Sequence, residues 1–154
     1  MPTMYEIYDR HAKEYHALVS AEDYKGNLAS LMRKEINWDG KEVFEAGTGT
    51  GRVTDIYIDR IRHAYCCDRS QHMLDYAKER LSKYEAKIDY VIADNLHLPT
   101  VADKVNVFVE GWSFGHTVSD GENENDISQR IHALVDNASK NVRKGGSVVL
   151  IESL

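Results

Sequence analysis

Apolar and polar residues follow two different periods along the chain, and the change falls near Gly40. Before Gly40, apolar or aromatic residues between positions 5 and 19 recur on one face of a helix. Ser20 and Asp23 then have the spacing of a capping pair, which predicts a second helix. The two expected helix faces consist of Tyr5, Tyr8, Ala12, Tyr15 and Val19, and of Leu28, Leu31, Met32 and Ile36.

Beyond Gly40, short apolar runs of strand length are separated by segments with helical periodicity. One helix is expected at residues 53–61, a second should be capped by Ser70, and a long third should end at Gly145. The apolar residues on one side of the capped helix are Met73, Leu74, Ala77, Leu81 and Tyr84. Those at helical spacing in the long helix are Ile127, Ile131, Leu134, Val135, Ala138 and Val142, with Arg143 and Lys144 at its C-terminal end. The expected strands are residues 42–46, 63–67, 88–93, 105–109 and 147–153.

Strands that lack polar alternation and are joined by helices indicate a parallel sheet with both faces covered. Because crossovers in such sheets are right-handed, the pattern predicts an α/β fold with a doubly wound, mainly parallel, Rossmann-like sheet and helices on both faces. The chain has 154 residues, a length that suits one domain. We therefore expect residues 1–154 to form a single domain, with two helices ahead of the sheet.

Charge and composition narrow the class of protein. The formal net charge of −6 at pH 7 argues against general binding of nucleic acids, which requires a basic face. The sequence shows neither an apolar run of membrane-spanning length nor a signal-like N-terminus, so we expect a cytoplasmic location and no membrane partner. The only cysteines, Cys66 and Cys67, point to opposite faces of a strand. We expect no disulfide and, since the histidines lack ligand spacing, no metal site.

A glycine-rich turn is the strongest indication of a ligand. Residues 43–53 read VFEAGTGTGRV, so Gly47, Gly49 and Gly51 follow directly after the first expected strand. Glycine lets a turn bend sharply and lets a ligand approach its backbone amides. In doubly wound sheets the ligand crevice lies at the carboxyl ends of the strands, which is where this turn stands. A purely structural tight turn is the alternative interpretation.

Three acids stand at strand ends near this turn. Asp68 ends the second expected strand, where a carboxylate can accept from both hydroxyls of an adenosine ribose. Asp94 ends the third strand, where a carboxylate can accept from an adenine amino group. Glu45, two residues before Gly47, could order the turn or face a positively charged ligand group. Helix capping by Asp68 and an ordinary turn at Asp94 and Asn95 are the structural alternatives.

The spacing of the glycines separates the possible cofactors. Dinucleotide-binding turns prefer G-x-G-x-x-G, whose third glycine allows close helix packing beneath the pyrophosphate. This chain has G-x-G-x-G, with Arg52 in place of that third glycine, and it lacks the lysine of a nucleoside-triphosphate loop. An adenosine without a phosphate chain fits this turn better. A nicotinamide-dependent oxidoreductase is the disfavoured alternative.

These motifs together resemble the class I S-adenosylmethionine-dependent methyltransferases. VFEAGTGTGR resembles their first motif, Asp68 their ribose-binding acid, ADNLHLP their adenine-binding loop and RKGGSVVLIES the segment that enters their fifth strand. The resemblance implies S-adenosylmethionine as cofactor, bound by a core of residues 40–154. It also implies a helical lid in residues 1–39, where Tyr8 or Tyr15 either closes the site or only packs between helices. The implied cofactor-binding residues are Glu45, Gly47, Thr48, Gly49, Asp68, Met73, Asp94, Asn95, Leu96 and Glu110.

The segment after the fourth strand, EGWSFGHTVSDGENEND, is expected to face the methyl acceptor. Glu110 could accept from the cofactor's amino group, and Trp112 and Phe114 could form an apolar wall. His116 is either a base or a loop histidine without chemistry, so no catalytic residue is assigned. An Asn-Pro-Pro-aromatic run, a Pro-Cys nucleophile and an acid cluster are all absent here. Their absence argues against nucleobase, glutamine, cytosine C5 and metal-dependent catechol-type methylation. We therefore expect a methyltransferase that acts on a small-molecule acceptor. The alternative is that the chain is a non-catalytic subunit, which binds cofactor or a partner.

The final residues, VVLIESL, leave the last expected strand at an edge of the sheet. In the resembled family the sheet continues through another helix and two more strands, which are missing here. A long apolar edge invites pairing with another chain. We therefore expect either that residues 1–154 are the N-terminal part of a longer chain, or that a partner or second copy completes the edge.

Overall fold

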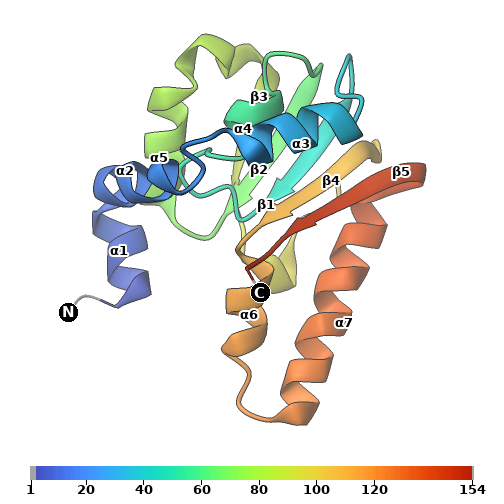
Figure 1. The fold of residues 1–154 in the computed structure, drawn as a ribbon. Helices are drawn as coiled ribbons and strands as arrows, with labels where there is room; N and C mark the ends of the chain where they lie inside the picture. Colours follow the sequence, from blue (N-terminus) through green and yellow to red (C-terminus); the bar gives the residue numbers. More distant parts are fainter. Residues whose placement is uncertain (1–2, 154) are drawn as a thin grey trace.

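The computed structural model describes residues 3–153. The side chain of Tyr5, and with it the expected place of Tyr5 on a helix face, lies outside what is described. Five strands form one sheet in the order β3-β2-β1-β4-β5, and every neighbouring pair is parallel (Figure 1). They are β1 (Glu42–Ala46), β2 (His63–Asp68), β3 (Ile88–Ile92), β4 (Val105–Gly111) and β5 (Val142–Ile151). The doubly wound α/β fold predicted from the sequence is confirmed.

Helices precede the sheet, connect its strands and cover it. In Figure 1, α3 and α4 cross one face of the sheet, and α7 runs along the other beside β5. The helices are α1 (Met4–Arg10), α2 (Ala12–Glu22), α3 (Asn27–Glu35), α4 (Thr54–Tyr57), α5 (Gln71–Arg80), α6 (Phe114–Ser119) and α7 (Glu124–Asn141), with short 3-10 segments η1 (Ser82–Lys87) and η2 (Asn95–His97). None of the helices within residues 3–153 is long and apolar enough to cross a membrane.

Each face of the sheet has its own apolar core, because successive side chains on a strand point to opposite faces. On β1, Val43 belongs to one core cluster and its neighbour Phe44 to the other, and both are fully buried. The first cluster includes Met32 of α3 and Tyr57 of α4, and the second includes Ala138 of α7. Burial on both sides explains why the central strands β1 and β4 lack polar alternation.

The N-terminal helices differ from their expected boundaries. The first expected helix is divided into α1 and α2, because His11 leaves helical geometry at φ −130° and ψ 38°. Ser20 lies inside α2 and is not a cap, so that prediction was wrong. α3 begins after Gly26, whose left-handed φ of 67° starts the helix later than the pattern suggested. Asp23 still reaches the first turn of α3, where its carboxylate accepts from the backbone N–H of Leu28 (3.1 Å).

Two later helices are shorter than expected. α4 covers only Thr54–Tyr57 because turns flank it on both sides. α7 ends at Asn141, ahead of the predicted stop at Gly145. The buried Asn141 side chain donates to the carbonyl of Pro99 (3.0 Å), and the next residue, Val142, already pairs with β4. The residues after α7 therefore belong to β5 instead of a helix end.

Two local predictions around β2 are confirmed. The Ser70 hydroxyl caps α5, since its oxygen accepts from the backbone N–H of Met73 (3.3 Å). Cys66 and Cys67 are free and buried, one in each core cluster. The opposite orientation of neighbouring strand residues keeps the two thiols apart.

Candidate functional site

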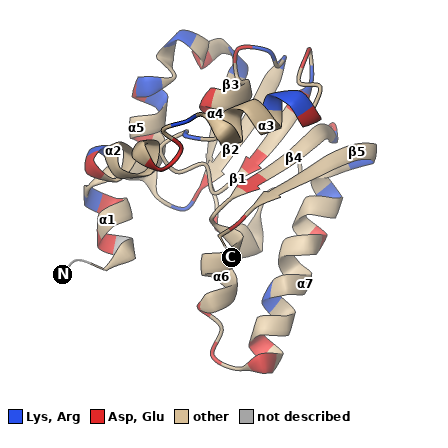
Figure 2. Cartoon of the chain, viewed as in Figure 1, with Lys and Arg blue, Asp and Glu red and all other residues tan. Residues whose placement is uncertain are grey.

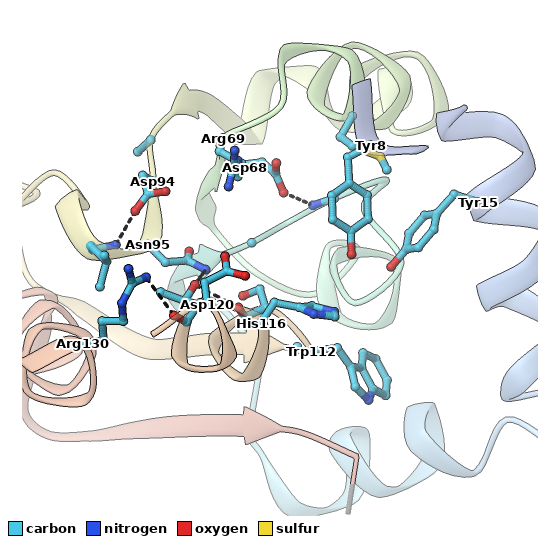
Figure 3. A pocket seen from close by; sticks show the side chains of 18 residues that line it. Tyr8, Tyr15, Asp68, Arg69, Asp94, Asn95, Trp112, His116, Asp120 and Arg130 are labelled. Carbon is cyan, nitrogen blue, oxygen red and sulfur yellow. Dashed lines mark hydrogen bonds between the residues drawn. The ribbon is translucent and has the colours of Figure 1, made fainter. Parts of the chain in front are cut away.

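A pocket opens at the carboxyl ends of β1, β2, β3 and β4 (Figure 3). Its empty volume, which includes space open to solvent, is about 770 Å³. Residues of α1 and α2 line it on one side, and residues of α6 and α7 on another. Seven of the expected binding residues line this pocket together, namely Gly47, Gly49, Asp68, Met73, Asp94, Asn95 and Leu96.

The glycine turn forms one wall of the pocket. Gly47, Gly49 and Gly51 have positive φ angles of 67°, 55° and 78°, which residues with a Cβ rarely adopt. A Cβ on Gly47 would collide with the Ser113 side chain, whereas nothing lies within 4 Å of the Cβ position of Gly49. Close packing against Ser113 therefore requires glycine at position 47, and the space beside Gly49 is open to a ligand.

Asp68 connects the glycine turn to α5. One carboxylate oxygen accepts from the backbone N–H of Gly49 (2.7 Å), and the other accepts from that of Ser70 (2.8 Å). Burial raises the pKa of Asp68, and these two hydrogen bonds act against the rise. Each carboxylate oxygen has a further lone pair, so Asp68 can also accept from the hydroxyls of a ligand.

Asp94 and Asn95 lie at one end of the pocket, and Tyr8 and Tyr15 lie at the other (Figure 3). Asp94 accepts from the backbone N–H of Leu96 (2.9 Å), which orders η2. The Asn95 side chain donates to Thr117 on α6 (3.3 Å), and its carbonyl accepts from Asn137 on α7 (2.9 Å). These contacts hold the expected adenine loop against two helices that follow it in the chain.

The described lining of the pocket does not include Glu45, Thr48 or Glu110, all of which are buried. The Glu45 carboxylate lies beneath the turn, where it accepts from the hydroxyls of Thr54 (2.8 Å) and Tyr57. Burial raises the pKa of Glu45 to about 7. These contacts join β1 to α4, the helix that follows the glycine turn.

Glu110 contacts the start of α6 instead of the pocket. Its Oε1 accepts from the backbone N–H groups of Ser113 (2.6 Å) and Phe114 (3.0 Å), while its Oε2 is buried with no partner among the described residues. Glu152, just beyond β5, accepts from the next amide, that of Gly115 (2.6 Å). Burial raises the pKa of Glu110 to about 7, and the charge of Glu152 adds to that rise. Two strand ends thus hold the helix that carries His116.

Aromatic side chains surround the other end of the pocket. Tyr8 and Tyr15 meet edge to face, with ring centroids 5.4 Å apart. Trp112 and His116 line the same region (Figure 3). Trp112 has a φ of 57°, which is unusual for a bulky residue, and its backbone N–H donates to the carbonyl of Ile151 (2.7 Å). Burial raises the pKa of the Tyr15 hydroxyl.

Phe114 does not form the apolar wall expected for it. Its ring packs in the second core cluster, with its centroid 6.2 Å from that of Phe108. Phe114 begins α6, and the helical turn directs it into the core while His116 lines the pocket. The helix could not be located from the sequence, so this division of side chains was not predicted.

Several lining residues were not singled out from the sequence: Arg69, Ser113, Thr117, Asp120 and Arg130. Four of them adjoin predicted features, because one follows Asp68 and three lie in the segment expected to face the acceptor. Arg130 has no such signal, since a polar residue on an amphipathic helix is normally solvated. It reaches the site because α7 packs beside α6, where Arg130 donates to the Thr117 carbonyl (3.1 Å) and to Asp126 (3.0 Å).

The pocket has the groups that an adenosine with a flexible polar tail requires. Asp68 stands where a ribose would lie, Asp94 can accept from an adenine amino group, and Met73 and Leu96 offer apolar surface for the ring. The open space beside Gly49 leaves room for a tail without a phosphate chain. These residues therefore fit S-adenosylmethionine.

Comparison with known proteins agrees with this chemistry. The methyltransferase domain family matches residues 43–146, more than half of the chain. An uncharacterized methyltransferase of Bacillus mycoides (strain KBAB4) is 26% identical over 96% of this chain and 66% of its own length. A second, from Bacillus cereus (strain 03BB102), is 25% identical with the same coverage. The chain thus spans 66% of the length of these curated relatives.

Solved structures extend the likeness to the fold. The DhpI-SAM-HEP complex superposes with a TM-score of 0.74 at 18% identity, over 96% of this chain and 63% of that one. The DhpI-SAH complex superposes with a TM-score of 0.72 at 21% identity, over 92% of this chain and 63% of that one. A Haemonchus contortus phosphoethanolamine N-methyltransferase superposes with a TM-score of 0.62 at 18% identity, over 98% of this chain and 33% of that one. The family match, the fold and the adenosine-type pocket lead to one conclusion: the chain belongs to the class I S-adenosylmethionine-dependent methyltransferases.

Proposed function

We propose that this protein transfers the methyl group of S-adenosylmethionine to a small-molecule acceptor. The observation that carries the proposal is that one pocket contains both kinds of group. Asp68 and Asp94, suited to an adenosine, line it together with Tyr8, Tyr15 and His116 at the other end. A cofactor held by the two acids would extend across the glycine turn toward these polar aromatic side chains.

S-adenosylmethionine, when bound, supplies a methyl group attached to a positively charged sulfur. The task of the protein is then to align an acceptor with that group and to exclude water. Tyr8 belongs to a segment docked on the core, since the Ser70 hydroxyl donates to the Tyr8 carbonyl (2.9 Å). The same docking brings Tyr15 over the pocket, where its hydroxyl can orient a polar acceptor.

The charge distribution supports a small molecule over a nucleic acid as acceptor. Basic and acidic segments are interspersed along the described helices (Figure 2). The formal net charge is −6, and a polyanion requires a continuous basic surface. A cytoplasmic location stays a prediction, and the two free cysteines are consistent with it.

The proposal is tested by methyl transfer from S-adenosylmethionine carrying a labelled methyl group. We expect label in the low-molecular-weight fraction of a metabolite extract and little in bulk RNA, DNA or protein. His116→Gln is expected to lower turnover while leaving cofactor affinity almost unchanged, if His116 acts on the acceptor. His132→Gln, at an exposed position on α7, is the matched control and should change neither. Label mainly in nucleic acid would contradict the proposal, and binding without any transfer would favour a non-catalytic subunit.

We also propose that the chain self-associates through the free edge of β5. Val148 and Leu150 on this strand are 48% and 60% exposed, and Ile131 and Val135 on the adjoining α7 are 44% and 63% exposed. An open strand with apolar neighbours favours pairing with another chain. Sedimentation velocity should show concentration-dependent association of residues 1–154, and Leu150→Lys should reduce it. A wild-type chain that stays monomeric at high concentration would refute this proposal.

A further inference from the structure

A smaller cavity adjoins the main pocket on the α2 side of the glycine turn. Both cavities are lined by Tyr15, Gly47, Gly49 and Trp112, so they meet at the turn. The empty volume of the smaller cavity is about 330 Å³. Among the described residues that line it, Arg52 alone carries a charge.

The Arg52 side chain is held in place but is not saturated with hydrogen bonds. Its guanidinium carbon lies 4.3 Å from the centroid of the Trp112 ring, a cation–π contact. One of its nitrogens donates to the Glu22 carboxylate (2.9 Å). The Arg52 side chain is only 17% exposed, whereas that of Glu22 is 58% exposed. A guanidinium has five N–H donors, so Arg52 can bind a second anion beside Glu22.

The two arginines that line the main pocket, Arg69 and Arg130, are not the ones nearest this smaller cavity. Arg69 follows Asp68 directly, and Arg130 lies near Asn95, so both stand toward the end that suits the nucleoside (Figure 3). Arg52 is thus the arginine on the far side of the glycine turn. A ligand whose adenosine is held by the pocket acids would direct its tail past Gly49 toward this side chain.

The tail of S-adenosylmethionine ends in an amino group and a carboxylate. A carboxylate removed from water needs a cation or strong hydrogen-bond donors, and a guanidinium can bind it with two parallel hydrogen bonds. We infer that Arg52, supported by Trp112 and Glu22, binds the carboxylate of the cofactor's methionyl group. This inference deepens the proposed function and rests on its cofactor pocket.

Two ligands that differ only in this carboxylate provide the test. S-adenosylmethionine and decarboxylated S-adenosylmethionine are titrated into the wild-type chain and into Arg52→Gln by calorimetry. We expect Arg52→Gln to weaken binding of S-adenosylmethionine about 10- to 100-fold, the loss typical of a hydrogen bond to a charged group. Binding of the decarboxylated ligand should change little. The difference between the two ligands isolates the contact from any general effect on the fold.

Further variants keep the test decisive if Arg52→Gln folds poorly. Arg52→Lys retains the charge and should keep part of the preference for the carboxylate. Glu22→Gln removes the competing carboxylate and should preserve or increase that preference. Arg60→Gln is the matched control, because Arg60 also pairs with a surface acid, Asp39 (2.8 Å), but lies outside both cavities. Arg60→Gln should leave the affinity for both ligands unchanged.

Two different failures can be told apart. Equal weakening of both ligands by Arg52→Gln, or weakening of neither, would overturn the role of Arg52 and leave the cofactor pocket intact. A wild-type chain that binds neither ligand would overturn the pocket as well. Tight, carboxylate-dependent binding without methyl transfer would support the inference while contradicting the proposed activity.

Discussion

Asp68→Asn is expected to weaken binding of S-adenosylhomocysteine by about 100-fold, because hydrogen bonds to a charged group contribute about 1.5–3 kcal/mol each before compensation. The carboxylate is expected to accept from the two ribose hydroxyls while it already accepts from Gly49 and Ser70. An asparagine retains one acceptor oxygen but directs an N–H₂ group toward one of these two backbone N–H donors. Isothermal titration calorimetry measures the change directly.

Asp89→Asn is a suitable control for this experiment. Asp89 is an exposed acid on the neighbouring strand β3, where its carboxylate lies 3.1 Å from the ring of His63. The same change of charge away from the pocket should leave the affinity within error of the wild type. Unchanged affinity in Asp68→Asn would instead mean that Asp68 serves only to connect the glycine turn with α5.

Gly47→Ala is expected to lower the free energy of unfolding by about 2–5 kcal/mol and to abolish measurable cofactor binding. A residue with a Cβ at a left-handed φ costs about 1–2 kcal/mol, and Gly47 has a φ of 67°. The new methyl group would also collide with the Ser113 side chain, and overpacking of this kind typically costs about 1–3 kcal/mol. Urea denaturation gives the stability, and calorimetry gives the affinity.

Gly40→Ala separates the cost of the left-handed backbone from the cost of the collision with Ser113. Gly40 has the same φ of 67°, but nothing lies within 4 Å of its Cβ position. Its substitution should therefore cost only the backbone part, about 1–2 kcal/mol, and should leave cofactor affinity unchanged. If both alanine variants lost the same stability and bound cofactor equally well, the close approach of Ser113 would not be the reason for glycine at position 47.

The strands could be predicted because the sheet is buried on both faces. Such strands are apolar along most of their length, so residues 42–46 were found with correct bounds and β2, β3 and β4 with errors of one or two residues. The mostly exposed edge strand β5 begins at Val142, five residues before its predicted start. Positive φ values and buried side-chain hydrogen bonds set the helix ends that were missed. Gly26 delays the start of α3, and Asn141 ends α7 early. Neither effect follows from the period of apolar residues.

The nucleoside end of the site could also be predicted. In a parallel sheet the carboxyl ends of neighbouring strands meet at one edge, so residues far apart in sequence, such as Gly49, Asp68 and Asp94, come together there by topology alone. Their distance along the chain has little influence on this result. The resemblance to a methyltransferase family rested on these positions, and the family match bears it out.

Only the tertiary structure decided which neighbouring side chains face the pocket. Glu45 and Glu110 stand at strand ends like Asp68, yet the packing of α4 and α6 turns their carboxylates toward Tyr57 and toward the amide of Ser113. Arg52 pairs with Glu22 of α2, a contact between segments whose docking has no local sequence signal. The sequence by itself determined the sheet, the turn and the two acids, because strand topology dictates where they meet. The orientation of the remaining groups depended on how the helices pack.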